Sequence, residues 1–187
     1  MSELGIGLLR RDNQVVMPWR NGTGVTKELA SGVVDEELVW RVSIARIDEP
    51  GAFSRWPGMH RSLTPLTGDQ VVLTVAGNDH AVLRGQTIEF SGDVVVACAL
   101  PGGPVEVLNL MTRRGEPLLE QHVHDLRDGP LEVAADDLDV LVEGDATVRP
   151  AAGRDVLEMA TLDALLPVSG PTRVVEGVGE LLVVHRP

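Results

Sequence analysis

Apolar and polar residues alternate with a period of two along most of this chain, which is the pattern expected of β-strands. In residues 38–44 every second side chain is apolar, while the intervening Arg41 and Ser43 are polar. This segment is therefore predicted to be a half-buried strand. The same reasoning predicts further strands at 69–76, 80–84, 94–100, 105–111, 118–126, 138–143, 172–176 and 179–185. Helical periodicity is scarce, and its best case is residues 161–166, a single turn closed by Pro167.

The predicted strands are separated by short segments of Gly, Asp and Pro, at the spacing of a β-sandwich or barrel. The chain changes character near residues 125–130: every Trp and Phe precedes this point, and short alternating runs of Val, Ala, Leu and acidic residues follow it. We predict two β-barrel halves, residues 1–128 with the functional motifs and residues 129–187 as a degenerate half packed on the first. Two packed antiparallel jelly rolls without an obvious internal repeat would form a bicupin.

The charge balance argues against a nucleic-acid partner. The 187 residues include 16 Lys and Arg against 28 Asp and Glu, a formal charge of −12, and no stretch concentrates the basic residues. The N-terminus has no basic lead followed by an apolar core, and no apolar run is long enough to span a membrane. We expect a cytoplasmic protein without membrane contact, either a monomer or a homodimer.

Side chains that could hold a metal or act as nucleophiles do not form a recognisable set. The single cysteine, Cys98, lies in an apolar run and is expected to be a buried, inert thiol. His122 and His124 form a His-x-His pair, but no Glu follows that would complete a metal-ligand set, and the region after residues 101–103 offers Glu106 and no His. The chain has no Gly-x-Ser-x-Gly elbow and no phosphate-binding glycine loop. We therefore expect no bound metal and no cofactor.

The densest motif is the segment 17–30, which combines Trp19, Asn21 and two glycines with several charged residues and ends in a strand-like run. Its glycines, Gly22 and Gly24, permit positive φ and close approach of the backbone. One interpretation is a tight turn between two strands, with Asn-Gly as the turn dipeptide and the tryptophan as a core residue. The other is a loop that places the tryptophan against a ligand.

Three further segments, 40–45, 53–63 and 108–115, follow this motif along the chain. In order and spacing, the four segments resemble the HutD/Ves family, small bacterial proteins of the cupin superfamily that are linked by context to histidine utilisation. The resemblance covers roughly residues 15 to 115 and implies an all-β bicupin of two RmlC-like barrels. Two residues depart from the family pattern. Thr23 replaces the middle glycine of a triple-glycine loop, and His60 replaces the acidic residue that usually precedes Arg61.

Polar residues recur in these segments at positions that should face a barrel interior. In 105–113, alternation puts Asn109, Met111 and Arg113 on one otherwise apolar side, where polar groups need partners. Either Arg61 or Arg113 forms a structural ion pair with one of the many carboxylates, or these donors converge on a ligand. The predicted ligand-binding residues are Trp19, Asn21, Arg41, Ser43, Phe53, Arg61, Asn109, Met111 and Arg113.

Guanidinium and amide donors beside a flat aromatic wall suit a small carboxylate. The family's link to histidine breakdown implies urocanate or a formylated or formiminated glutamate. Three interpretations remain open: a non-catalytic protein that senses or buffers this metabolite, a metal-independent cupin enzyme that uses Glu28 or His60 as acid or base, and a structural domain with a vestigial pocket. The missing metal triad favours the first, a binding protein for a small anionic metabolite.

Overall fold

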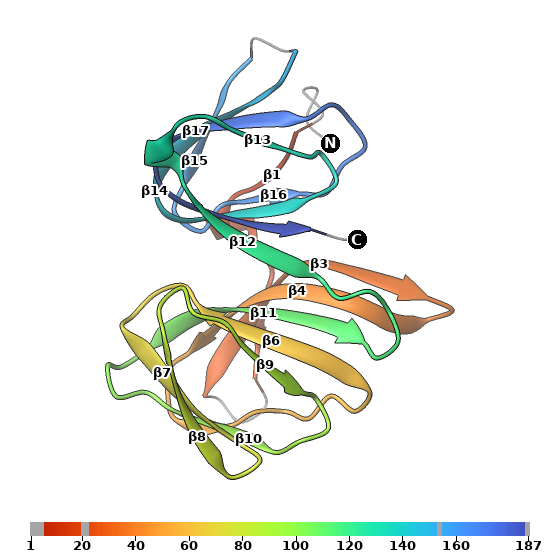
Figure 1. Ribbon diagram of the computed structural model, residues 1–187, viewed down its shortest axis with the longest axis vertical. Helices are drawn as coiled ribbons and strands as arrows, with labels where there is room; N and C mark the ends of the chain where they lie inside the picture. The colour runs from red at the N-terminus through yellow and green to blue at the C-terminus, as the bar shows by residue number, and fades with distance from the viewer. Residues whose placement is uncertain (1–5, 20–22, 153–154, 186–187) are drawn as a thin grey trace. The chain divides into compact units, whose positions relative to one another are not determined.

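The computed structural model describes residues 6–19, 23–152 and 155–185 (Figure 1). Every strand pairing in it is antiparallel, and the described residues contain two short 3-10 turns, η1 (Arg11–Asn13) and η2 (Leu126–Asp128), but no α-helix. The all-β class predicted from alternation is thereby confirmed. No helix within these ranges is long and apolar enough to cross a membrane.

The chain forms two compact units. One comprises residues 15–118, and the other joins the segment up to Gln14 to the residues from Leu119 onward. These boundaries differ from the predicted division at residue 128. The N-terminal strand β1 (Gly7–Leu9) pairs with β16 (Ala164–Leu166) near the other end of the chain, and residues 120–125 pair with residues 180–185. Pairing between segments so far apart has no local sequence signal.

The unit of residues 15–118 contains two sheets. The six-stranded sheet has the order β2 (Val16–Pro18), β3 (Gly24–Val34), β4 (Glu37–Ile47), β11 (Val105–Arg113), β6 (Met59–Pro65) and β9 (Ile88–Ser91). The four-stranded sheet has the order β5 (Gly51–Ala52), β10 (Val96–Ala99), β7 (Gln70–Val75) and β8 (Asn78–Leu83). One hydrophobic core joins the two sheets, since Leu63 and Val107 of the first pack in the same cluster as Leu73 and Cys98 of the second. Cys98 is buried there, as its apolar surroundings predicted.

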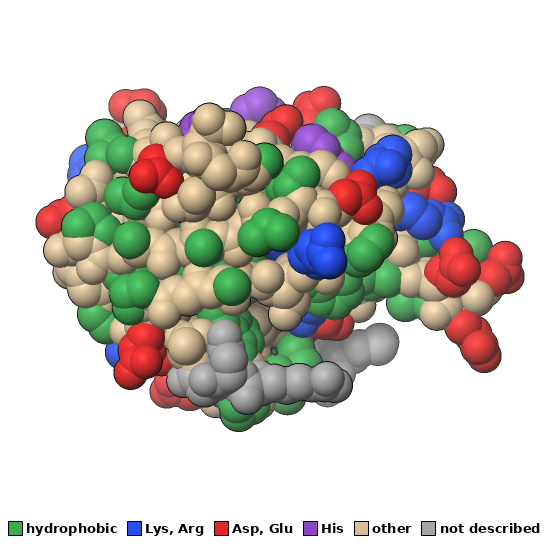
Figure 2. All heavy atoms as spheres, turned by 90° about the horizontal axis from the view of Figure 1, so that it is seen from below, with side chains coloured by type: hydrophobic (Ala, Val, Ile, Leu, Met, Phe, Trp, Pro, Cys, Tyr) green, Lys and Arg blue, Asp and Glu red, His purple; other side chains and the backbone are tan. Residues whose placement is uncertain are grey.

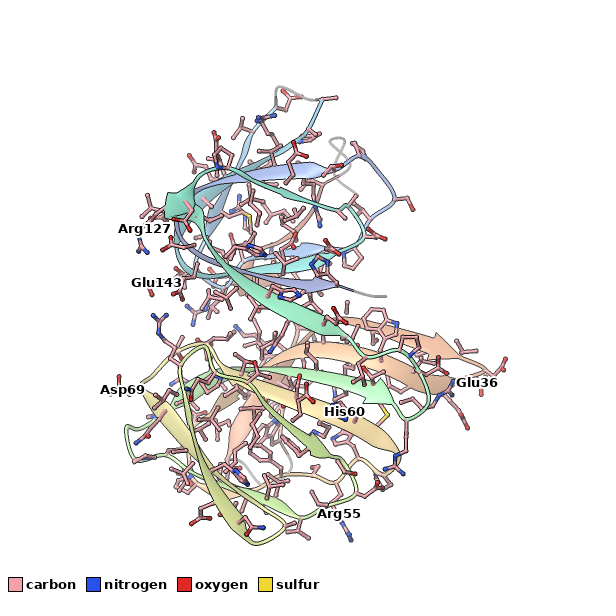
Figure 3. All side chains as sticks on the ribbon, viewed as in Figure 1. Glu36, Arg55, His60, Asp69, Arg127 and Glu143 are labelled. Carbon is pink, nitrogen blue, oxygen red and sulfur yellow. The ribbon has the colours of Figure 1, made fainter. Side chains whose placement is uncertain are left out.

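Strands β3 and β4 form a long hairpin whose tip is Asp35 and Glu36. Both residues have positive φ, 50° and 64°, and Val34 pairs directly with Glu37 across them. A two-residue turn of this kind matches the right-handed twist of the flanking strands. Figure 3 labels Glu36 at this tip.

The second unit is built around one seven-stranded sheet. Its main path is β1, β16, β14 (Leu138–Pro150), β17 (Arg173–His185) and β12 (Glu120–Asp125), while β13 (Leu131–Val133) pairs with β17 and β15 (Leu157–Ala160) pairs with β14. The two strands predicted at 172–176 and 179–185 are one continuous strand, because Gly177 and Gly179 lie where β14 approaches too closely for a side chain. The helical turn predicted at 161–166 is wrong: Ala164–Leu166 is strand β16, whose backbone bonds to β1 and β14 outweigh the local pattern.

A buried arginine, Arg173, contacts several separate segments of this second unit. Arg173 is 1% exposed, and its guanidinium lies 3.0 Å from the carboxylate of Asp139, which is fully buried. The same guanidinium donates hydrogen bonds to the backbone oxygens of Leu166, Ala134 and Asp137. A buried charge is tolerated when it is paired and hydrogen-bonded in this way, so the arginine serves the fold.

Candidate functional site

A cavity of about 360 Å³ opens within the unit of residues 15–118. Two of its lining side chains carry a charge, and both are arginines. The lining consists of Pro18, Trp19, Thr26, Arg41, Ser43, Ala45, Ile47, Ala52, Phe53, Ser54, Trp56, Arg61, Val107, Asn109 and Met111. No carboxylate, imidazole or thiol belongs to this set, so the described lining is positive and otherwise apolar or neutral.

Strand register brings the polar residues of three neighbouring strands into adjacent rows. Met111 of β11 lies opposite Arg41 of β4 on one side and Arg61 of β6 on the other. Asn109, two residues earlier on β11, lies opposite Ser43. Because side chains two apart on a strand share a face, all five point to the same side of the sheet.

Arg61 is the most deeply buried charged residue of the lining, with 5% of its surface exposed. Its guanidinium donates to the backbone oxygen of Ser54 at 3.2 Å and, in a long hydrogen bond of 3.5 Å, to the amide oxygen of Asn109. It lies 4.9 Å from the ring centre of Phe90 and 5.8 Å from that of Phe53, which permits cation–π contact. Its Nε–H is buried without a hydrogen-bond partner, and no carboxylate of the described residues forms an ion pair with it.

Burial and the neighbouring Arg41 guanidinium lower the pKa of Arg61 to about 10. The side chain therefore remains charged at neutral pH, in a place where that charge is poorly solvated and repelled. A buried charge without a counter-ion is costly unless something else supplies the opposite charge. The electrostatics of this side of the cavity consequently suit an anion.

Arg41 is held differently. Its Nε lies 2.7 Å from a carboxylate oxygen of Glu28 on β3, and its guanidinium carbon lies 5.6 Å from the ring centre of Trp56. Only 13% of its side chain is exposed, against 38% for Glu28. The other carboxylate oxygen of Glu28 accepts a hydrogen bond from Ser31. Arg41 thus has an acidic partner, whereas Arg61 has none among the described residues.

Aromatic side chains form the walls of the cavity. Trp19 donates its indole N–H to the hydroxyl of Thr26 at 2.7 Å and meets Phe53 edge to face, with ring centres 6.0 Å apart. Gly24 makes this arrangement possible: a Cβ there would lie 2.3 Å from the backbone oxygen of Arg46 and 3.2 Å from the tryptophan ring. Its predicted role in close backbone approach is therefore confirmed.

Seven of the nine residues predicted to bind a ligand line this one cavity: Trp19, Arg41, Ser43, Phe53, Arg61, Asn109 and Met111. Asn21 lies outside the described residues. Arg113 is not in the lining, because it lies at the end of β11 and its guanidinium pairs with Glu37 at 3.1 Å and with Glu116 at 2.9 Å. The structural ion pair considered for Arg61 or Arg113 is thus found at Arg113.

Sequence reasoning missed Trp56, Thr26 and Ser54 as lining residues. A signal for Trp56 was present, since it lies between Phe53 and Arg61 in one motif, but its position depends on the backbone. The backbone N–H of Trp56 donates to the backbone oxygen of Gly92, and the backbone N–H of Phe53 donates to that of Val96. These bonds fix the connection after β5 against a distant part of the chain.

The histidines lie outside the cavity lining. His60, labelled in Figure 3, precedes Arg61 on β6 and therefore faces the opposite way, where its Nε2 lies 3.4 Å from Glu89. On β12, His122 packs its ring 5.7 Å from that of His185, whose Nδ1 is 2.8 Å from Asp137. No group of three or more His, Cys, Asp or Glu side chains placed to hold a metal occurs in the part of the chain that the structure describes.

The strand order and the shared core define an all-β, cupin-like protein, and solved structures of low sequence identity share the fold. The chain belongs to the HutD family, whose model matches residues 11–183. A solved structure of HutD from Pseudomonas fluorescens is 29% identical, with a TM-score of 0.77 over 97% of this chain and 99% of that one. The resemblance read from the motifs is thereby confirmed.

Two curated relatives match over part of their length. A Pseudomonas putida protein named "Uncharacterized 21.2 kDa protein in hutC 3'region" is 40% identical over 107 residues, 56% of each chain. Protein Ves of Citrobacter koseri is 41% identical over 99 residues, 51% of this chain and 52% of the relative. The match therefore spans about half the length of each curated relative.

Proposed function

We propose that the cavity binds a small carboxylate of histidine breakdown, and that the protein senses or buffers this metabolite without turning it over. The observation that carries the proposal is Arg61: a guanidinium that is 5% exposed, retains a partnerless Nε–H and has no ion-pairing carboxylate among the described residues. A bound carboxylate would supply both the missing charge and the missing acceptor.

The second unit provides a comparison within the same chain. Arg173 is similarly buried and its Nε–H also lacks a hydrogen-bond partner, but its guanidinium is paired with Asp139 and donates to three backbone oxygens. A fold that needed a buried arginine at position 61 only for stability would be expected to pair it in the same way. The difference favours a ligand role for Arg61.

The volume and the lining of the cavity restrict the class of ligand that it can bind. A cavity of about 360 Å³ lies at the small end of the range for metabolite sites, which is roughly 300 to 1,000 Å³. Urocanate, with a flat ring and one carboxylate, suits the walls formed by Trp19, Phe53 and Trp56, and formyl- or formimino-glutamate could pair one of its carboxylates with Arg61. The hutC-region name of one relative supports the choice of ligands from histidine breakdown.

Binding without turnover is supported by the chemistry of the lining, which offers hydrogen-bond donors and no side chain that would titrate near neutral pH. Of the two acid–base candidates for an enzyme, His60 faces Glu89 outside the cavity lining, and Glu28 is engaged by Arg41. The face in Figure 2 shows basic side chains scattered among acidic and apolar ones, which fits a metabolite partner better than a nucleic acid.

The test is calorimetric titration of the purified protein with urocanate, N-formyl-L-glutamate and N-formimino-L-glutamate, with the amide of urocanate as an uncharged control. We expect one-to-one binding of at least one acid and no heat from the amide. Mass spectrometry of each acid after prolonged incubation should find it unchanged. If no acid binds, the proposal fails, and if an acid is consumed, the protein is an enzyme.

At the level of architecture, we propose a bicupin in which each of the two units is one antiparallel jelly roll. Support comes from two sheets that share one core in residues 15–118 and from a second, separate core built around Leu141, Val175 and Leu181. We also propose a cytoplasmic monomer or homodimer. Light scattering of the purified protein tests the oligomeric state.

A further inference from the structure

We propose that Glu28 selects ligands by charge, by disfavouring a second carboxylate in the cavity. The inference rests on the proposed function and concerns which acids the same site accepts. It follows from the unequal partnering of the two arginines, because Glu28 compensates Arg41 and leaves Arg61 as the one uncompensated charge among the described residues around the cavity.

The position of Glu28 is fixed by its strand. On β3 it lies opposite Ser43, a lining residue, next to a bulge between Glu28 and Ala30. One carboxylate oxygen is 2.7 Å from the Arg41 Nε, and the other accepts a hydrogen bond from Ser31 at 2.9 Å. The carboxylate is therefore held beside the arginine that lines the cavity, although it is not itself part of the lining.

The net charge around the cavity determines whether a ligand with one carboxylate or with two is preferred. Among the described residues, two guanidiniums and one carboxylate leave a net charge of one positive unit, which a ligand with a single carboxylate neutralises. A ligand with two carboxylates brings its second charge toward Arg41, where Glu28 already holds that guanidinium and repels a further anion. Specificity of this kind comes from a repulsive element as much as from attraction.

The decisive comparison uses two ligands of the same skeleton. N-formyl-L-glutamate carries two carboxylates, and N-formyl-L-glutamine carries one, with an amide in place of the other. Both are titrated into the wild-type protein and into Glu28→Gln, which keeps the shape of the side chain and removes its charge. The measured quantity is the ratio of the two dissociation constants, because a general effect of the substitution on the site cancels in that ratio.

We expect Glu28→Gln to shift the ratio in favour of N-formyl-L-glutamate by roughly five- to tenfold at low ionic strength, the effect of removing one charge several ångströms away in a partly exposed site. Glu37→Gln is the matched control. It removes a carboxylate that pairs with Arg113, which lies outside the cavity lining, and it should leave the ratio unchanged.

The possible results separate charge selection by Glu28 from ligand binding by the cavity. If Glu28 serves only to position Arg41, both ligands weaken together in Glu28→Gln, the ratio stays as in the wild type, and charge selection is refuted while ligand binding stands. A ratio that shifts equally in Glu37→Gln would show a diffuse effect of net charge and would also refute a specific role. If neither compound binds the wild-type protein, the inference falls, whereas binding of urocanate in the same assay would leave the proposed function standing.

Discussion

Replacing Arg61 with methionine should stabilise the unliganded protein while abolishing carboxylate binding. The guanidinium is buried beside a second arginine, and these surroundings lower its pKa to about 10. Since each unit of pKa corresponds to about 1.36 kcal/mol, the lowering amounts to roughly 3 kcal/mol of unfavourable free energy for the charged, folded form. Because the pKa is lower in the folded than in the unfolded chain, this penalty persists at every pH below about 10 and is relieved only above it.

Methionine fills a similar volume without a charge, but it loses the hydrogen bonds to Ser54 and Asn109. Each such bond contributes about 1 kcal/mol, so we expect a net gain of about 1 to 2 kcal/mol in the free energy of unfolding for Arg61→Met. For a chain of this size, that gain raises the melting temperature by roughly 2 to 8 °C. Exchanging function for stability in this way is typical of binding sites.

The assay is thermal unfolding followed by circular dichroism, combined with calorimetric titration of the same samples. Arg113→Met is the matched control: it removes an arginine that pairs with Glu37 and Glu116 outside the cavity lining, and should change neither binding nor, appreciably, the melting temperature. An Arg61→Met protein that melts lower than the wild type and still binds the acid would show that Arg61 is structural, and the reasoning would be refuted.

Three further outcomes follow from the same geometry. Arg173→Met should cost about 3 to 5 kcal/mol of stability, measured by urea unfolding, because it leaves Asp139 buried without its partner. Burial already raises the pKa of Asp139 to about 7, so this loss should be smaller at pH 5, where the carboxyl is protonated. Carboxylate affinity, measured by calorimetry, should hold up to about pH 9 and fall as Arg61 deprotonates near its pKa of about 10. Ligand binding should change tryptophan fluorescence, and Trp56→Leu should lose part of that signal and weaken binding by about 0.5 to 2 kcal/mol, since its ring faces both the cavity and Arg41.

The strands were largely predictable because alternation is a local property. The alternating pattern of residues 105–111 predicts β11 and correctly places Asn109 and Met111 on the face that meets the cavity. The same alternation predicts that Arg113 also meets the cavity, and this prediction is wrong. At the end of a strand a long side chain can turn to nearby acids such as Glu116. Alternation identifies a face but does not determine where a flexible side chain at a strand end will lie.

Burial was predicted less well than secondary structure. The strand at 38–44 was expected to be half-buried, yet residues 42–45 are all buried and Ser43 is only 2% exposed. Its polar face borders the cavity rather than the outer surface, and polarity alone does not distinguish the two. The partnering of Arg41 by Glu28 was also not predictable, since it depends on how a bulge in β3 sets the register against β4.

A crystal structure of the protein with urocanate or N-formyl-L-glutamate, whichever binds tighter in solution, tests most directly whether Arg61 binds the carboxylate of a ligand. We expect the ligand in the cavity of residues 15–118, with a carboxylate oxygen within about 3.2 Å of the Arg61 guanidinium and the rest of the molecule against Trp19 and Phe53. A ligand bound elsewhere, or bound in the cavity with no contact to Arg61, would contradict this expectation.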